Sequence, residues 1–451
     1  MQKLILIIVC ALIYSINFYS LSNAKSIRLI RDTEIEYFLQ KLINEILIVK
    51  NVEINSIKPR LLLNNDINAF IIGNEKIYVN TGLLENVTSV DEIQGILAHE
   101  IGHLLLGHYQ SRKVFIRKNT QNLSLALFTM LGASIAKSNP NLNGFILATK
   151  DLDKKLKSKY SKQQEMEADI FAINSLKKLN LSLKGLINFF EKTDKKYKIL
   201  ADHNFHTYYA SHPSPEKRLK LIRSLSRKSN TSLRQKINFK FFNIPLKQIQ
   251  IKIHVISNNK NKLEEFDTEN DPFLNEYLDL AKSYLNKNYD KALINAKTIL
   301  LIDKFNPFLF EVNGNLNLQL NKLDQAIFNY SKALKLAQNS NIKNKSLIKL
   351  SLARAYIKKN NEINFKKSFK LLEEIMPYEK SNSLLWRNIA ISSGKLKKQS
   401  IAYIALAEEQ VIKNNLKKAK KYALLGLKDK NLRYLYKIRG KDILNLKPLE
   451  K

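Results

Sequence analysis

Hydrophobic and polar positions recur with helical spacing over most of the chain and alternate like strands in one short part. Residues 27–49 mix charged and apolar positions with a helical period, which predicts an amphipathic helix. Residues 60–63, 67–72 and 77–80 are apolar, β-branched runs separated by turn-forming residues. The first part of the chain is therefore predicted to combine helices with a small antiparallel sheet.

Two further helix starts are predicted from capping patterns. Ser89 and Glu92 form a Ser-x-x-Glu capping box, so a helix is expected from about Val90. Ser161 and Gln164 form a similar pair further along the chain. The apolar side of the first of these helices consists of Ile93, Ile96, Leu97, Ile101, Leu104 and Leu105.

Two apolar segments, residues 123–136 and 145–148, flank the turn Asn139-Pro140-Asn141. Neither can cross a bilayer upright, because a spanning helix needs about 20 residues. One interpretation is a helical hairpin that packs near a cleft of the protein or rests on a membrane surface. The other is a pair of ordinary core helices, and the sequence does not separate the two.

From about residue 271 the pattern becomes repetitive and helical. Ala292 and Ala326 lie 34 residues apart, which is the period of a tetratricopeptide repeat. Gly314 and Ala333 occupy small-residue positions of the same repeat. Residues 271–440 are therefore predicted to form an all-α solenoid with a groove for peptides or partner proteins. A generic helical bundle is the alternative.

Residues 227–270 are predicted to be a linker and the start of the helical region. Ile249, Ile251 and Ile253 alternate as in a strand, whereas Pro245 suits the first turn of a helix. Both interpretations remain open at this point.

Composition limits the possible partners. The chain has 451 residues, 45% of them hydrophobic, which gives room for two or three globular domains. A net charge of +35 invites a nucleic-acid partner. The lysines are spread from end to end instead of forming a stripe, so nucleic-acid binding is not predicted. A basic surface does favour anionic membranes or acidic proteins by long-range attraction.

The first 24 residues have the pattern of a secretory signal peptide. Lys3 gives a basic start, residues 4–14 are apolar, and Ser22-Asn23-Ala24 is a small-x-small cleavage site. An uncleaved anchor is the alternative. The one cysteine, Cys10, lies inside the apolar run, so the cleaved chain has no thiol for disulfides or catalysis. These features predict an exported protein with at most peripheral membrane contact.

The stretch from His99 to His103 matches His-Glu-x-x-His, the pattern of a zinc site on a helix. Residues four apart lie on one helical face, with Cβ atoms about 5–6 Å apart, so both imidazoles can reach one ion. Glu100 then lies beside them, where it can accept a proton from the attacking water. A catalytic zinc takes three protein ligands, so a third must come from elsewhere in the chain.

Glu165 and Asp169 are candidates for the third ligand and a residue that orients a ligand. They are four residues apart near a predicted helix start, which puts both carboxylates on one face. His108 lies five residues beyond His103, about 140° further around a continuous helix. It is therefore predicted to pack or to form hydrogen bonds, and not to bind the ion.

Together these motifs resemble the HtpX and CaaX-prenyl-protease family of zinc endopeptidases. The resemblance is strongest to its periplasmic branch, that of the β-barrel assembly-enhancing proteases. It implies an α-rich α+β fold, in which a zincin-like metallopeptidase domain over residues 25–226 precedes the repeats. The motifs that carry it are His99-Glu100-Ile101-Gly102-His103, Glu165 with Asp169, and His212-Pro213 with Arg218.

The resemblance also implies roles for single residues. It makes His99, His103 and Glu165 the ligands of one zinc ion and Glu100 the general base. Asp169 would hold a ligand histidine, with Arg218 beside it. His212 would either cap the zinc in a latent state or help to stabilise the oxyanion.

A further implied feature is an edge strand formed by Asn68, Ala69 and Phe70 beside the cleft. A substrate could add itself there as a strand, held mostly by backbone hydrogen bonds.

The function implied by the resemblance is hydrolysis of peptide bonds in misfolded or misassembled envelope and outer-membrane proteins. The repeats would dock the protein to unfolded substrates or to the outer-membrane assembly machinery. The alternative is a chaperone-like repeat adaptor whose metal site stays latent.

Overall fold

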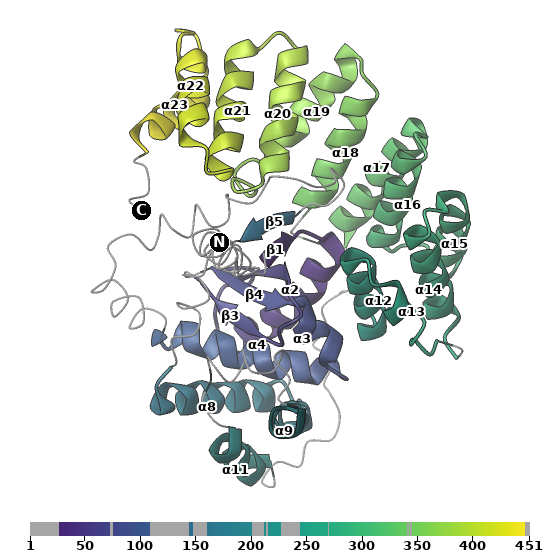
Figure 1. The fold of residues 1–451 in the computed structure, drawn as a ribbon, viewed down its shortest axis with the longest axis vertical. Helices are drawn as coiled ribbons and strands as arrows, with labels where there is room; N and C mark the ends of the chain where they lie inside the picture. Colours follow the sequence, from purple (N-terminus) through teal and green to yellow (C-terminus); the bar gives the residue numbers. More distant parts are fainter. Residues whose placement is uncertain are drawn as a thin grey trace, which may run out of the picture.

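The structure is a computed structural model and describes residues 27–72, 75–108, 144–147, 160–200, 212, 215–226, 244–268, 270–340, 342 and 345–446. Helices dominate it, and one five-stranded sheet lies in the N-terminal half (Figure 1). The predicted combination of many helices with one small sheet is confirmed.

The sheet has the strand order β3-β4-β2-β1-β5. In that order the strands are Ala69–Ile71, Lys76–Asn80, Lys58–Leu63, Ile27–Ile30 and Gly144–Leu147. The prediction of an antiparallel sheet is wrong, because β2 and β4 are parallel, with Arg60 opposite Tyr78. β3 lies at the outer edge and pairs antiparallel with β4, so the chain returns through β4 in the direction of β2.

Two segments predicted to be helical are strands. Residues 27–30 form β1, and helix α2 begins only at Thr33 and runs to Val49. Asp32 separates them, because its carboxylate accepts hydrogen bonds from the backbone N–H groups of Glu34 and Ile35 at 3.1 and 2.9 Å. Residues 145–147 lie in β5 and pair with β1. This pairing satisfies backbone N–H and C=O groups along the edge of β1, which a helix at residues 145–147 could not do. Residues 123–136 lie outside the described residues.

Five more helices complete the first part of the described chain: α3 Thr81–Asn86, α4 Val90–Leu105, α8 Lys162–Lys178, α9 Lys184–Leu200 and α11 Pro215–Ser226. The predicted helix starts are confirmed: Ser89 caps α4, and Ser161 with Gln164 forms a complete capping box on α8. Apolar side chains of α2 and α4 pack with those of β2, β3 and β4 in one buried core.

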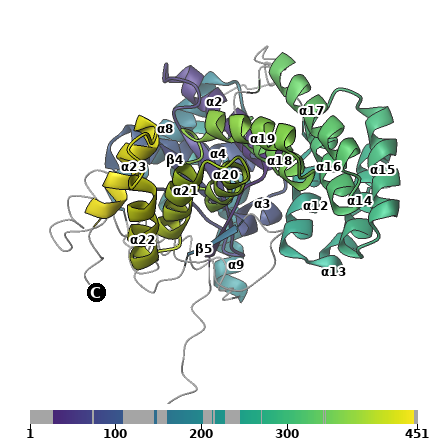
Figure 2. The same ribbon diagram turned by 90° about the horizontal axis from the view of Figure 1, so that it is seen from above.

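The rest of the described chain is helical. Pro245 precedes α12 (Leu246–Ser257), so the helical alternative for this segment is the correct one. After α13 (Lys260–Leu263) come α14 Pro272–Leu285, α15 Tyr289–Ile302, α16 Pro307–Gln319, α17 Leu323–Asn339, α18 Ser346–Lys358, α19 Glu362–Ile375, α20 Ser383–Lys395, α21 Gln399–Ile412, α22 Leu416–Leu427 and α23 Tyr434–Asn445. These helices follow one another in a curved row (Figure 2).

The helical row covers the second face of the sheet. Leu29, Leu62 and Tyr78 from the strands share a buried core with Trp386 and Phe369 from the row. The sheet is thus enclosed between α2 and α4 on one face and the row on the other.

A buried ionic cluster links the part of the chain that contains the sheet to the helical row. Arg31 donates to Glu379 at 2.9 Å and pairs with Glu36 at 2.5 Å, and Arg60 reaches Glu36 at 3.3 Å. Since these charges are buried, each depends on its partners for stability.

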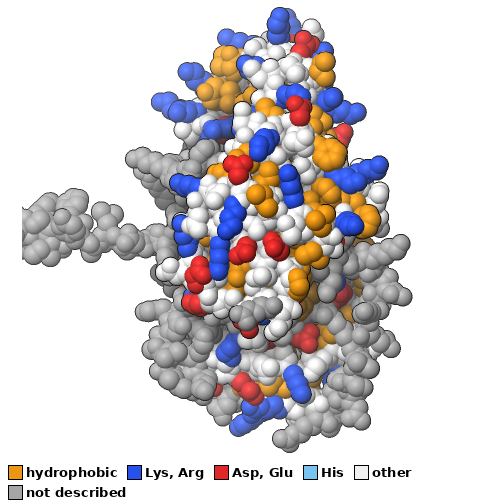
Figure 3. All heavy atoms as spheres, turned by 90° about the vertical axis from the view of Figure 1, so that its right-hand side faces the viewer, with side chains coloured by type: hydrophobic (Ala, Val, Ile, Leu, Met, Phe, Trp, Pro, Cys, Tyr) orange, Lys and Arg blue, Asp and Glu red, His pale blue; other side chains and the backbone are white. Residues whose placement is uncertain are grey.

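The face of the molecule drawn in Figure 3 has no single basic stripe. On this face, lysine and arginine side chains are scattered among apolar and some acidic ones. No helix in the described ranges has the length and apolar character to cross a membrane.

Candidate metal centre

Helices α4 and α8 approach closely at Gly102. A Cβ atom at this position would meet the side chain of Phe171 at 3.1 Å, so the absence of a side chain permits the close packing. Gly102 is adjacent to His103, and Phe171 lies on α8 beyond Glu165 and Asp169. The contact therefore brings the carboxylates of α8 to the histidines of α4.

Four side chains meet there in one buried group: His99, His103, Glu165 and His212. The possible ligand atoms all lie within 4.8 Å of one another. Nε2 of His99 and Nε2 of His103 are 3.1 Å apart, and each is 3.5 Å from an oxygen of Glu165. The structure thus brings the three predicted ligands together with the histidine that follows them in the sequence.

This triangle of atoms fits a single metal ion. Ligand atoms held about 2.0–2.2 Å from a tetrahedral ion lie roughly 3.3–3.6 Å apart, close to the distances observed. Two imidazoles and a carboxylate are also a ligand set that catalytic zinc sites use. Oε1 of Glu100 is buried beside them and accepts no hydrogen bond in the described part of the chain, so it is available to a polar ligand of the ion.

Asp169 and Arg218 orient His99. Nδ1 of His99 lies 3.0 Å from Oδ1 of Asp169, which directs Nε2 toward the other ligands. Arg218 donates two hydrogen bonds of 2.7 Å to Asp169 and lies 3.1 Å from Glu165. Asp169 therefore lies on the Nδ1 side of His99, away from the other ligands, and Arg218 holds it there.

These contacts set the charges of the group. Burial and Arg218 favour neutral His99, but hydrogen bonds to Asp169 and Glu165 outweigh them and raise the pKa of His99 to about 9. Burial lowers the pKa of His103 to about 2. Burial alone would raise the pKa of Glu165, yet His212 and the hydrogen bonds of the imidazoles hold it far below its usual value. Without a metal, His99 is therefore positively charged at neutral pH and His103 is neutral.

His103 is oriented by two residues whose contribution the sequence did not reveal. Its Nδ1 lies 3.0 Å from Nδ1 of His108, and Nε2 of His108 lies 2.8 Å from Oε2 of Glu167. The prediction that His108 forms hydrogen bonds is confirmed, but its position on a continuous helix was wrong. α4 ends at Leu105, and Gly107 adopts a left-handed conformation, φ +76°, which returns His108 to His103. A glycine at this point was the available signal for the helix end.

Tyr160 and His212 enclose the group. The ring of Tyr160 stacks on His103 with centroids 3.8 Å apart. Nδ1 of His212 lies 2.9 Å from Glu165, and its Nε2 lies 3.4 Å from Oε1 of Glu100. Burial raises the pKa of Glu100 above its ordinary value, although His212 and His99 oppose the shift. A raised pKa suits a carboxylate that must take up a proton near neutral pH.

The predicted edge strand lies at the rim of the sheet. Ala69 and Phe70 are in β3, the outermost strand beside β4, and Asn68 directly precedes it. β3 contacts α4, the helix that carries the histidines. Phe70 stacks on Tyr78 of β4, with ring centroids 5.5 Å apart.

Comparison with known proteins agrees with this geometry. The family described as Peptidase family M48 matches residues 31–226. Over 174 residues the chain is 27% identical to Metalloprotease LoiP and 28% identical to Metalloprotease YcaL, both from Escherichia coli (strain K12). It is also 26% identical over 149 residues to the mitochondrial Metalloendopeptidase OMA1 of Bos taurus.

These matches cover only part of each protein. The LoiP and YcaL matches span 38% of this chain and 64% and 63% of those relatives, and the OMA1 match spans 33% of this chain and 28% of OMA1. All the residues of the metal centre lie inside the range that the family matches. Residues 31–226 of this chain therefore match Peptidase family M48 over the whole metal centre.

Proposed function

We propose that the protein is a zinc-dependent endopeptidase. The observation that carries this proposal is the convergence of His99, His103 and Glu165 from two helices, with Glu100 beside them. A zinc ion bound there supplies Lewis acidity, which polarises a peptide carbonyl and lowers the pKa of water to about 7. The names of the relatives, metalloproteases and a metalloendopeptidase, support the same reaction.

Glu100 acts as the general base in this proposal. Its carboxylate takes the proton of the attacking water and then gives it to the leaving amine. Its burial and its place beside the zinc ligands support this role. Asp169 and Arg218 hold His99 in the tautomer that offers Nε2 to the ion.

His212 has two possible roles, and one substitution separates them. Because it lies within ligand distance of the other three residues, it could cap the ion and keep the enzyme latent. Alternatively, its Nε2 stabilises the oxyanion of the transition state. His212→Ala should raise basal proteolysis if the residue is a cap and lower it if the residue stabilises the oxyanion.

A pair of variants tests the proposed activity. Glu100→Gln should retain zinc and lose casein cleavage, because it removes only the base. Glu165→Ala should lose zinc affinity as well. Equal cleavage by the wild type and Glu100→Gln would refute the endopeptidase proposal.

We also propose that the helical row is a tetratricopeptide-repeat solenoid that docks proteins. Helices α15 and α17 begin 34 residues apart, at Tyr289 and Leu323. Gly314 lies so close to the ring of Tyr330 that a Cβ atom would meet it at 2.6 Å, as expected of a small-residue position. A substrate strand could in addition pair with β3, the outer strand beside α4.

The cellular role is a proposal as well. The signal-like first 24 residues support export to the periplasm, where the substrates would be misfolded or misassembled envelope and outer-membrane proteins. The second candidate is a chaperone-like adaptor with a latent metal site, which the position of His212 favours. Loss of client protection in Glu100→Gln would favour the peptidase, and full protection by that variant would favour the adaptor.

A further inference from the structure

A second concave site lies where the helical row meets the start of α2. It is a cavity of about 260 Å³, and it shares no residue with the metal centre. Its walls come from the N-terminal end of α2 and from α12, α14, α16 and α18. Much of the wall is aliphatic, with Leu280, Leu316 and Leu347 among its residues.

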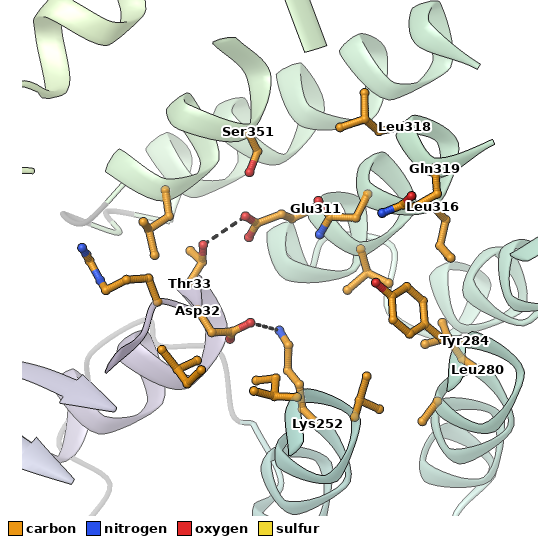
Figure 4. Close-up of a pocket in the computed structure, with 18 of the residues that line it drawn as sticks. Asp32, Thr33, Lys252, Leu280, Tyr284, Glu311, Leu316, Leu318, Gln319 and Ser351 are labelled. Atoms are coloured by element: carbon orange, nitrogen blue, oxygen red, sulfur yellow. Dashed lines mark hydrogen bonds and ion pairs between the residues drawn. The ribbon is translucent and has the colours of Figure 1, made fainter. Parts of the chain in front are cut away.

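Charged side chains face each other across this cavity. Thr33 donates a hydrogen bond of 3.1 Å to Glu311, and Lys252 pairs with Asp32 at 3.0 Å (Figure 4). Burial raises the pKa of Glu311 to about 7. At neutral pH this carboxyl group is therefore able both to accept and to donate a hydrogen bond.

Three polar groups of the lining have no partner of their own. The hydroxyls of Tyr284 and Ser351 and the guanidinium of Arg354 form no hydrogen bond or ion pair with any part of the chain that the structure describes. In Figure 4 the hydroxyls of Tyr284 and Ser351 point into the same space as Glu311. All three residues are half-buried and reach the open space of the cavity, so a polar ligand that enters it can pair with them.

The mixture of donors and acceptors narrows the class of ligand. A phosphate group would need a lining of donors and would be repelled by Asp32 and Glu311. The volume lies below the usual range of about 300–1,000 Å³ for cofactor and drug pockets. An extended peptide offers main-chain donors and acceptors together and can insert one aliphatic side chain between the leucines.

The charge of the lining narrows the class of ligand further. Arg31 is paired with Glu36 and Glu379, and Lys252 is paired with Asp32 and Glu34. Arg354 is the cation of the lining that has no anionic partner in the described part of the chain. A carboxylate on the ligand would complete the pairing of Arg354 by charge-assisted hydrogen bonds. The net charge of +35 would also attract an acidic segment from a distance.

We propose that this cavity binds an extended segment of a client polypeptide in which an aliphatic residue stands next to an acidic one. The aliphatic side chain fills the space between the leucines, and the acidic side chain pairs with Arg354. The inference rests on the proposed function only in taking the client to be a protein, since binding here requires no cleavage.

The test is direct binding to the full chain carrying Glu100→Gln, which cannot consume the peptide. The probe is a fluorescent ten-residue peptide, amidated at its carboxyl end, with a central leucine flanked by acidic residues. A matched peptide has lysine at the acidic positions. The acidic peptide should bind saturably and at least about tenfold more tightly than the lysine peptide.

Two substitutions on α18 give the matched comparison. Arg354→Gln should weaken binding of the acidic peptide about tenfold or more. Lys349→Gln removes the same charge from the same helix, where it pairs with Glu374 at 2.6 Å outside the cavity, and should leave binding within about twofold. Ser351→Phe, which fills the cavity, should also weaken binding, with melting curves confirming that each variant folds.

Several results would overturn the inference. They are equal binding of the two peptides, equal effects of Arg354→Gln and Lys349→Gln, and binding that requires a free terminal carboxylate. Casein cleavage by the wild type is measured in parallel. Cleavage without cavity binding would overturn the inference alone, whereas binding without cleavage would overturn the proposed peptidase alone.

Discussion

Replacing His108 by alanine should weaken zinc binding without removing any ligand. In the native chain Nδ1 of His103 lies 3.0 Å from Nδ1 of His108, and His108 in turn lies 2.8 Å from Glu167. If His103 offers Nε2 to the ion, its Nδ1 carries the proton and donates to His108. His108 then has its own proton on Nε2 and donates it to Glu167, so all three groups are fixed in one orientation.

The magnitude follows from the burial of His103. His103 is fully buried, so His108→Ala leaves its N–H group without an acceptor. An unsatisfied buried donor costs about 1–3 kcal/mol, which corresponds to roughly a 5- to 150-fold loss of metal affinity. This range agrees with the roughly 10- to 100-fold effects typical of residues that orient metal ligands.

The assay is competition for zinc between the purified chain and a fluorescent chelator, with melting curves to confirm folding. Glu167→Gln keeps an acceptor oxygen for His108 and should have a smaller effect than His108→Ala. His254→Ala removes a buried imidazole on α12, away from the site, and should leave the affinity unchanged. Unchanged zinc affinity in His108→Ala would refute the role given to the His103–His108 contact.

Three further predictions concern the pH dependence of zinc binding, the packing of α4 on α8, and the ionic cluster between the sheet and the helical row. Because the pKa of His99 is about 9, zinc must displace a proton at pH 7.5. The affinity for zinc should rise up to about tenfold per pH unit and level off above about pH 9. Calorimetry in two buffers with different ionisation enthalpies should show the release of the proton. Gly102→Val should force α4 from Phe171 and lower the free energy of unfolding by about 1–3 kcal/mol in urea titrations, where no loss would contradict the close packing. Arg31→Met should cost about 3 kcal/mol by the same measurement, whereas Lys262→Met, which breaks an exposed pair, should cost under about 1 kcal/mol.

Local patterns were sufficient to predict the elements that carry the centre. Ser89 and Ser161 are the N-cap residues of α4 and α8 and bond to residues only three positions further on. The starts of both helices could therefore be located from neighbouring residues alone. The four-residue spacing of His99 and His103 places both side chains on one face of a single helix, and the structure has them there. Long-range pairing was less accessible: β1 and β5 are stabilised by each other across more than a hundred residues, and no local signal distinguishes them from short helices.

The surroundings of the ligands depend on tertiary contacts in the same way. Glu167 lies on the same turn of α8 as Glu165, but nothing in its spacing shows that it meets His108. The turn at Gly107 that joins them was detectable in principle, since glycine is the usual residue at a helix C-terminus. The cavity between α2 and α18 could not be predicted, because its lining residues come from five helices far apart in the sequence.

The central claim is that His99, His103 and Glu165 share one zinc ion. Its most direct test is the zinc content and X-ray absorption spectrum of the purified chain and of Glu165→Ala. The account predicts one zinc per chain, bound by two imidazoles, or by three if His212 caps the ion, with oxygen completing the shell. It also predicts at least about a hundredfold weaker binding in the variant. Equal affinity and identical spectra for the two proteins would contradict it.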